Sequence, residues 1–323
     1  MNDGSTVGVV VMAYGTPASP EDVEAYYTHI RRGRPPSPEQ LTNLQLRYDA
    51  LGGTSTLGAR TRDQLDALVR ALDELAPGRF RVALGQKHAA PFVEDGVASL
   101  LDQGVSQVVG LVLAPHYSAF SVGQYHERAA AVCDQAGVAF VGIESWHELA
   151  EYRAFLADAV GAALAELPER TKVVFTAHSL PERVLSEDPY PDQLWESAHA
   201  VALASGLNRW AGWSQAWQSA GATPEPWRGP DILAVIRDLA ATGRADGVLV
   251  CPQGFVADHL EVAYDLDIEA ARVAGETGLA FARTRVLNDD PTVLAALARR
   301  VASVADPMAA ATVADPAVPS GAA

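Results

Sequence analysis

The chain has few cysteines and no long apolar run. Its 323 residues include only two cysteines, Cys133 and Cys251, which lie far apart. Because the sequence opens with polar residues rather than a secretory leader, we expect both to be reduced thiols and do not expect a structural disulfide. No apolar run approaches the roughly 18 residues that a membrane-spanning helix needs. The sequence therefore predicts a cytoplasmic protein without a transmembrane anchor.

Positive charge is scarce as well. The chain has 24 Lys and Arg against 40 Asp and Glu, a formal net charge of -16. Such a protein repels nucleic acid and anionic membrane surfaces, so neither is an expected partner. An anionic ligand would need a local basic patch. The phosphate-binding patterns G-x-G-x-x-G and G-x-x-x-x-G-K are both absent, which disfavours nucleotide binding of those two types.

Length and composition indicate a two-domain globular protein. Hydrophobic residues make up 49% and charged residues 20%, as in a folded soluble chain. Since 323 residues exceed one ordinary core, we predict an N-terminal domain at 1–150 and a C-terminal domain at 151–305. The last helix is expected to pack back on the N-terminal domain. The Ala- and Pro-rich residues 306–323 are predicted to form a flexible tail.

Short apolar runs of strand length alternate with helical stretches. This alternation predicts an α/β fold with parallel strands, and fully apolar runs indicate strands that helices cover on both faces. The two halves share this rhythm, which favours two similar doubly wound lobes. The predicted strands are Val7–Val11, Val105–Leu113, Lys172–Thr176 and Gly247–Cys251, and the predicted helices include Thr61–Leu75, Tyr152–Leu167 and Asp231–Ala241.

Polar residues follow the predicted strands at the edge where open α/β sheets bind ligands. His178 leaves the end of one buried strand, followed by Ser179 and Pro181. A histidine in this position is suited to accept protons near neutral pH. A core histidine whose ring nitrogens are simply hydrogen-bonded explains the motif equally well.

Three carboxylates recur every fourth residue in a predicted helix. Glu261, Asp265 and Glu269 would lie along one helix face. A solvated acidic stripe is the simplest interpretation, because exposed like charges at this spacing repel only weakly. The apolar neighbours Phe255 and Leu260 favour a cleft-facing Glu261, and a row of oxygen ligands is a plausible path for a divalent cation.

Arginines cluster near the N-terminus of this acidic chain. Arg31, Arg32 and Arg34 are followed by Arg47 and Tyr48. A solvated loop is the default interpretation of so short a cluster. The alternative is the local anion site that a carboxylate-bearing substrate would require, since arginine pairs well with carboxylates.

Seven segments, in order between Val7 and about Val301, resemble the ferrochelatase family. The length and the Arg-rich segment are most similar to the Gram-positive enzymes that act on coproporphyrin III. The seven segments are VMAYGTP, YYTHIRRGRP, LAPHYSAFSVGQY, TAHSLPERV, DPYPDQL, WQSAGATPEPWRGPDI and GFVADHLEVAYDLD.

This resemblance implies the chelatase fold, two Rossmann-like domains with four-stranded parallel sheets. It also implies a coproporphyrin ferrochelatase that inserts Fe²⁺ into coproporphyrin III and releases two protons in haem biosynthesis. Porphyrin and ferrous iron are then the substrates, with no permanently bound cofactor. Two cysteines cannot supply the four ligands of a [2Fe-2S] cluster, so none is expected. We expect a monomer with transient contacts to neighbouring haem-pathway enzymes.

The resemblance assigns roles to individual residues. His178 matches the family's catalytic histidine, Glu261 its acidic partner, and Tyr14 a tyrosine that approaches the metal from the opposite face. These three, with Asp265 and Glu269, are the predicted metal-contacting residues. In the Gram-positive enzymes the helix that carries the acidic row has π-helical character, which suits a spacing of four.

Further positions match residues that hold the propionates of coproporphyrin or lie at the cleft edge. Lys87 and His88 match the cleft edge. The predicted propionate-binding residues are Arg31, Arg32, Arg47, Tyr48, Ser55 and Tyr125.

Three alternatives remain. One is a ferrochelatase acting on protoporphyrin IX. A noncatalytic tetrapyrrole or haem carrier is disfavoured by His178 and Glu261, since a carrier needs no proton acceptor. A cobalt or nickel chelatase for another macrocycle is disfavoured by Tyr14 and the arginines.

Overall fold

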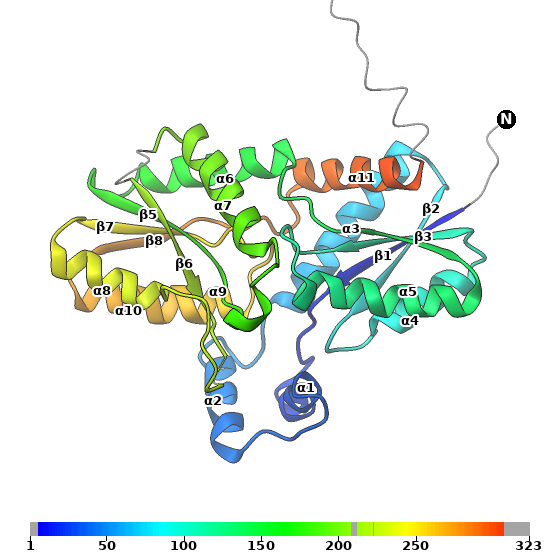
Figure 1. Ribbon diagram of the computed structural model, residues 1–323, viewed down its shortest axis with the longest axis horizontal. Helices are drawn as coiled ribbons and strands as arrows, with labels where there is room; N and C mark the ends of the chain where they lie inside the picture. The colour runs from blue at the N-terminus through cyan, green and yellow to red at the C-terminus, as the bar shows by residue number, and fades with distance from the viewer. Residues whose placement is uncertain (1–5, 208–211, 222, 307–323) are drawn as a thin grey trace, which may run out of the picture.

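The computed structural model describes residues 6–207, 212–221 and 223–306. Its N-terminal half is built on a four-stranded parallel sheet in the order β2-β1-β3-β4 (Figure 1). The strands are β1 Val7–Ala13, β2 Phe80–Gln86, β3 Gln107–Val112 and β4 Ala139–Ile143.

The C-terminal half repeats this arrangement. Its parallel sheet has the order β6-β5-β7-β8. The strands are β5 Thr171–His178, β6 Trp213–Gln218, β7 Gly247–Cys251 and β8 Ala280–Arg283. Two similar doubly wound halves with four-stranded parallel sheets are therefore confirmed. The four strands predicted from the sequence are the two central strands of each sheet.

Helices cover both faces of the sheets, and short helical turns join them. Asp231 caps the helix that follows it, because its side chain accepts a hydrogen bond from the Leu233 amide at 2.8 Å. The three predicted helices form with shifted bounds, at Leu57–Leu75, Ala150–Leu164 and Ile232–Thr242. The helices are α1 Val23–Ile30, α2 Pro38–Asp49, α3 Leu57–Leu75, α4 Val93–Asp102, α5 Gln124–Ala136, α6 Ala150–Leu164, α7 Tyr190–Ala204, α8 Ile232–Thr242, α9 Leu260–Val262, α10 Ala271–Glu276 and α11 Pro291–Ala305, with a π-helix at Ala263–Ala270.

One hydrophobic cluster runs through both halves. It contains Val9 of β1, Leu111 of β3, Phe175 of β5, Leu249 of β7 and Leu297 of α11, all fully or almost fully buried. Burial of such side chains stabilises each by about 1.5–3 kcal/mol. Two further clusters cover the other faces of the two sheets. The shared cluster fixes one half against the other and so fixes the cleft between them.

The C-terminal helix crosses back to the first half of the chain. α11 packs against α3 and also contacts β3, β4 and α6 (Figure 1). Near its end, the Gln107 side chain donates a hydrogen bond to the carbonyl of Ala305 at 2.9 Å. The predicted flexible tail lies outside the described residues except for Asp306, which pairs with Arg79. None of the helices in the described ranges is long and apolar enough to cross a bilayer.

Two N-terminal helices project from the sheets. α1 and α2 lie together below the two halves in Figure 1. α2 begins with a capping box, in which Ser37 accepts from the Gln40 amide and Gln40 reaches back to the Ser37 amide. Tyr48 of α2 packs with Val23 of α1 and Leu260 of α9 in a small buried cluster. Through this cluster the projecting helices are tied to the C-terminal half.

Candidate active site

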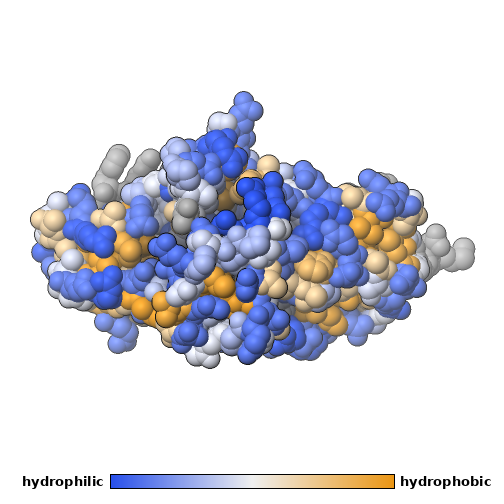
Figure 2. All heavy atoms as spheres, turned by 90° about the horizontal axis from the view of Figure 1, so that it is seen from below, coloured by the Kyte–Doolittle hydropathy of each residue, from blue (hydrophilic) through white to orange (hydrophobic). Residues whose placement is uncertain are grey.

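A cavity of about 1090 Å³ lies between the two halves, at the carboxyl ends of the strands. Both sheets, α1 and α2 contribute to its wall. The face seen in Figure 2 is hollowed near its middle, and hydrophilic side chains gather around the hollow. This volume is slightly above the usual range for small-molecule sites, about 300–1,000 Å³. The cavity has room for a ligand as large as a macrocycle.

Most of the residues predicted from the sequence line this cavity. Three do not: Arg31, Asp265 and Glu269 are absent from its wall. The predicted residues that line it are Tyr14, Arg32, Arg47, Tyr48, Ser55, Lys87, His88, Tyr125, His178 and Glu261.

His178 is the last residue of β5 and faces the cavity. Its Nδ1 donates to the Ser179 carbonyl at 2.5 Å, and its own carbonyl accepts from the Tyr190 hydroxyl at 3.3 Å. The loop after β7 packs against this strand end at Gly254, where a Cβ would lie only 2.5 Å from that of Ala177. A glycine is therefore required for this close approach.

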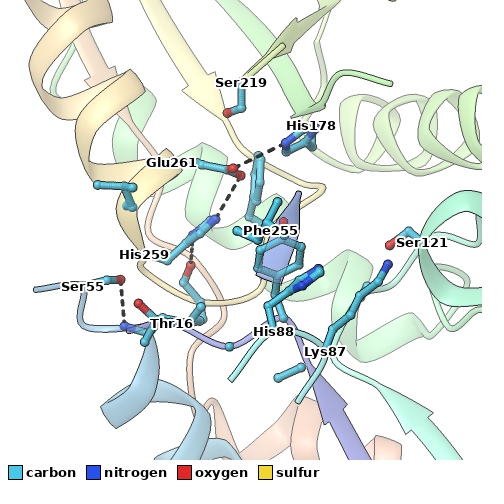
Figure 3. A pocket seen from close by; sticks show the side chains of 18 of the residues that line it. Thr16, Ser55, Lys87, His88, Ser121, His178, Ser219, Phe255, His259 and Glu261 are labelled. Carbon is cyan, nitrogen blue, oxygen red and sulfur yellow. Dashed lines mark hydrogen bonds and ion pairs between the residues drawn. The ribbon is translucent and has the colours of Figure 1, made fainter. Parts of the chain in front are cut away.

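Glu261 lies between two imidazoles at the beginning of α9. Its Oε1 is 3.4 Å from Nε2 of His178, and its Oε2 is 3.5 Å from Nε2 of His259 (Figure 3). His259 in turn donates from Nδ1 to the Ala257 carbonyl at 2.9 Å. One carboxylate therefore has a histidine at each oxygen.

The two carbonyl acceptors determine where protons are found on these rings. A carbonyl oxygen only accepts, so Nδ1 must carry a proton in both His178 and His259. In each neutral ring, Nε2 then holds a lone pair. Each Nε2 faces the Glu261 carboxylate, and it is the ring nitrogen at which a proton is gained or lost.

The charged forms of His178 and Glu261 stabilise each other. Burial alone would lower the pKa of His178, but the Glu261 carboxylate and the Ser179 carbonyl outweigh it and raise the pKa. Burial alone would raise the pKa of Glu261, but His178 and then His259 lower it well below its usual range. The site therefore favours a charged His178–Glu261 pair at the cavity wall.

The facing wall comes from the N-terminal half. Tyr14 directly follows β1, and 44% of its surface is exposed toward the cavity. Protein nevertheless surrounds the hydroxyl, and this burial, with the nearby Glu261 carboxylate, raises the pKa of Tyr14. Its ring lies 4.7 Å from that of His88, measured between centroids. Tyr14 is therefore a neutral phenol at physiological pH.

Cationic groups also reach the cavity from this side. Lys87 lies with its Nζ 5.0 Å from the centroid of the Tyr125 ring, and burial, with Arg128 and Arg32, lowers the pKa of Lys87 to about 8. Figure 3 places Lys87 and His88 across the cavity from His178 and Glu261. Burial and the neighbouring Lys87 lower the pKa of His88 to about 3, so this imidazole is neutral.

Adjacent arginines have different environments. Arg32 has a left-handed backbone with φ 57° and lines the cavity. Arg31 lies outside it, with its guanidinium 5.7 Å from the Tyr27 ring centroid and its Nε donating to the Arg34 carbonyl at 3.3 Å. In this structure Arg32, rather than Arg31, contributes to the cavity wall.

The predicted acidic row is divided between two cavities. Asp265 and Glu269 lie in a π-helix, Ala263–Ala270, as the resemblance implies, whereas Glu261 lies in the preceding α9. Glu261 faces the main cavity, whereas Asp265 and Glu269 line a neighbouring cavity of about 280 Å³. Arg47 pairs with Asp265 and lines both cavities.

A family model described as ferrochelatase matches residues 6–305 of the chain. This chain belongs to the ferrochelatase family. The family inferred from the seven sequence segments is thus confirmed.

Curated relatives match nearly the whole length of this ferrochelatase-family chain. The coproporphyrin III ferrochelatase of Geobacillus kaustophilus (strain HTA426) is 43% identical over 300 residues, covering 91% of this chain and 94% of that protein. The coproporphyrin III ferrochelatase of Bacillus subtilis (strain 168) is 42% identical over 299 residues, covering 90% and 96%.

Solved structures with the same fold are more distant in sequence. SirB from Bacillus subtilis with Fe³⁺ has a TM-score of 0.55 and 12% identity, covering 94% of this chain and 98% of that one. CbiX, described as the terminal enzyme for biosynthesis of sirohaem in denitrifying bacteria, has a TM-score of 0.50 and 14% identity, covering 92% and 98%. At such identities the likeness shows the fold alone, and it confirms the predicted chelatase fold.

Sequence reasoning did not single out two residues that organise this ferrochelatase-family site. His259 contacts Glu261, and only its place within the segment GFVADHLEVAYDLD signals its importance. Gln218 is almost fully buried at the end of β6 and donates to the Glu261 carbonyl at 3.1 Å. Thr176 orients Gln218 through a 2.8 Å hydrogen bond to its Oε1. Their places in the segments TAHSLPERV and WQSAGATPEPWRGPDI are the only sequence signal of this pair.

The substitution Glu261→Gln is predicted to lower the pKa of His178. It removes the negative charge that raises this pKa and leaves burial, which opposes the charged ring. NMR titration of isotope-labelled imidazoles measures the change. Glu276→Gln, at an exposed position where Glu276 pairs with Arg272, is the control and should leave the titration unchanged. An unchanged His178 pKa in Glu261→Gln contradicts the electrostatic coupling of the pair.

Proposed function

We propose that this protein inserts Fe²⁺ into coproporphyrin III, forming coproheme and releasing two protons, as a step of haem biosynthesis. The observation that carries the proposal is Glu261 between His178 and His259 on the wall of a macrocycle-sized cavity. Two relatives that match 90% or more of the chain are coproporphyrin III ferrochelatases, which supports the choice of substrate.

The proton chemistry follows from the ring tautomers. Metallation exchanges one Fe²⁺ for the two N–H protons of the macrocycle. His178 and His259 offer one Nε2 each to accept a proton, and the carboxylate between them stabilises the imidazolium that results. Because an imidazolium cannot accept, His178 must lose its proton before each abstraction. The Glu261 carboxylate raises the pKa of His178 and so makes this ring a stronger base.

Tyr14 completes the site from the opposite half. As a neutral phenol, it can contact a porphyrin or an incoming metal on the face away from His178 without adding charge. Flanking a flat ring from both faces would let the protein bend it and expose nitrogen lone pairs. Contacts with remote parts of the substrate can offset that strain.

The cations along the cavity suit a carboxylate-rich ring. Arg32, Arg47 and Lys87 all line the cavity in a protein of net charge -16. Each could pair with a propionate carboxylate, and coproporphyrin carries four of these where protoporphyrin carries two. Ser55, Tyr48 and Tyr125 lie on the same wall. This local positive charge favours coproporphyrin.

The proposal extends to the setting of the reaction. We place the enzyme in the cytoplasm as a monomer without a resident cofactor, using iron as substrate. Both cysteines are free thiols and buried, as a reducing compartment permits. Transient transfer of substrate and product to neighbouring haem-pathway enzymes fits this setting.

Anaerobic metallation tests the proposed function. The purified protein is incubated with Fe(II) and either coproporphyrin III or protoporphyrin IX, and the porphyrin absorbance bands are followed as they change to those of the metallated ring. We expect turnover that favours coproporphyrin. Preference for protoporphyrin would overturn the substrate choice, and tight binding of both rings without metallation would indicate a carrier.

Arg31→Met and Arg32→Met form a matched pair that tests the substrate-binding wall. Arg32→Met should raise the KM for coproporphyrin by about 10- to 100-fold, because a charge-assisted hydrogen bond contributes about 1.5–3 kcal/mol. Arg31→Met should have little effect, because Arg31 lies outside the cavity. Steady-state kinetics with both porphyrins measure the KM of each variant. A larger loss in Arg31→Met would mean that substrate binding rearranges the loop.

A further inference from the structure

Two further imidazoles meet at the wall of the main cavity, on the side of the N-terminal half. Nδ1 of His29 lies 3.0 Å from Nδ1 of His88, and both residues line the cavity. His29 is exposed in the last turn of α1, and His88 is half-buried in the loop after β2. A hydrogen bond between two ring nitrogens needs one donor and one acceptor, so one Nδ1 carries a lone pair instead of a proton. The contact therefore brings a metal-ligating atom to the cavity wall.

Packing fixes both rings in place. His29 stacks on Phe92 at 5.2 Å between ring centroids, and His88 lies 4.7 Å from Tyr14, measured in the same way. The loop that carries His88 is joined to the end of β1, because the His88 amide donates to the Tyr14 carbonyl at 3.0 Å. α1 is joined to the same segment by a 3.0 Å hydrogen bond from the Tyr26 hydroxyl to the carbonyl of the residue after Tyr14. The two histidines and Tyr14 are thus held together without a ligand.

The 3.0 Å separation suits two ligands of one metal ion. Imidazole nitrogens bind zinc at about 2.0–2.1 Å, and two bonds of that length at a right angle place their nitrogens about 3.0 Å apart. Ferrous iron also accepts imidazole ligands. A rotation of the rings turns both lone pairs toward a shared point. The ring that donates in the hydrogen bond then carries its proton on Nε2 instead of Nδ1, so both imidazoles stay neutral and no proton is released.

We propose that His29 and His88 capture ferrous iron at the cavity wall and pass it to the porphyrin on the Tyr14 face, a proposal that rests on the function proposed above. The hydrated ion exchanges two waters for the imidazoles, and a second ligand exchange releases it to the ring. The iron stays divalent throughout. His88 lies across the cavity from His178 (Figure 3). The proton acceptor and the metal donor therefore act on opposite faces of one ring, and neither blocks the other.

The capture site is expected to bind iron weakly, as a site that must release its metal does. It supplies two imidazoles and leaves the other positions of the ion to water. Lys87 precedes His88 in the chain and also lines the cavity, so its positive charge opposes a second cation nearby. The four nitrogens of the macrocycle can then take the iron from the two imidazoles.

Co²⁺ binding to the full-length protein without porphyrin tests the capture site. Co²⁺ is the neighbour of ferrous iron in its affinity for nitrogen ligands, and its unpaired electrons broaden the NMR signals of nearby nuclei. Protein with isotope-labelled histidine is titrated with substoichiometric Co²⁺, and each imidazole signal is assigned by its loss in the corresponding His→Ala variant. We expect the His29 and His88 signals to broaden, both in the unmodified protein and in His178→Ala.

Two substitutions of His29 separate metal binding from the hydrogen bond. Asparagine places an amide nitrogen near the position of Nδ1, so His29→Asn can keep the contact with His88 but is a poor metal ligand. His29→Asp supplies a carboxylate ligand at the same place. His29→Asn should abolish the broadening of His88 and raise the KM for Fe²⁺ by about tenfold, the effect of about 1.4 kcal/mol of lost binding, while the KM for coproporphyrin stays unchanged. His29→Asp should restore both properties.

His199→Asn is the matched control. This ring stacks on Trp195 at 4.7 Å between centroids and is absent from the cavity wall. The variant should keep the Co²⁺ broadening of His29 and His88 and the KM for Fe²⁺ of the unmodified protein.

Two results would overturn the capture site. One is Co²⁺ that leaves the His29 and His88 signals sharp while it broadens those of other histidines. The other is a KM for Fe²⁺ that is the same in His29→Asn and in the unmodified protein. The titration contains no porphyrin, and the proposed reaction is tested by iron insertion with unmodified protein. Failure of the capture site can therefore be distinguished from failure of the proposed function.

Discussion

The structure depends on how a partly buried carboxylate is kept charged. Glu261 lies at the junction of both halves, and a charge in such a place is costly unless it is paired. Two imidazoles supply the pairing, and each is oriented because its Nδ1 donates to a backbone carbonyl. The backbone therefore dictates which ring nitrogen faces the acid. The tautomer of each ring follows from hydrogen bonds that are local in sequence.

The cavity also needs a second wall at a fixed distance from the Glu261 wall, and the fold supplies it. One hydrophobic cluster joins the inner faces of both sheets, and α11 packs back onto α3. The carboxyl end of β5 thus presents His178 while the carboxyl end of β1 presents Tyr14, with the cavity between them. Neither half alone encloses a planar ligand. His178 comes from one half and the cationic, aromatic wall from the other. They face each other across the cavity because the two halves share one core.

The sequence predicts the central strands and misses the edges for one physical reason. β1 and β7 are buried along their whole length and read as continuous apolar runs. The edge strand β4 alternates exposed and half-buried residues over most of its length, and β8 is only half-buried throughout. Their sequences, AFVGI and AFAR, resemble many short segments that are not strands. Burial on both faces produces the continuous apolar run by which a strand is recognised in the sequence, and an edge strand lacks such a run.

The candidate site could be predicted only in part. His178 and Glu261 were found through strand-end position and family resemblance, but their 3.4 Å approach depends on packing between distant segments. The pairing of Arg47 with Asp265 spans 218 positions and has no local signature. Arg32 has a left-handed φ and lines the cavity whereas Arg31 does not, a difference that a run of arginines does not reveal.

The most direct test of the central claim is single-turnover metallation of coproporphyrin by His178→Ala, with porphyrin binding measured in the same sample by fluorescence. If His178 accepts the pyrrole protons, binding persists while the metallation rate falls by about 10²- to 10⁴-fold, the usual contribution of a general base. Metallation at the unmodified rate would remove His178 from proton transfer and contradict this account of the site.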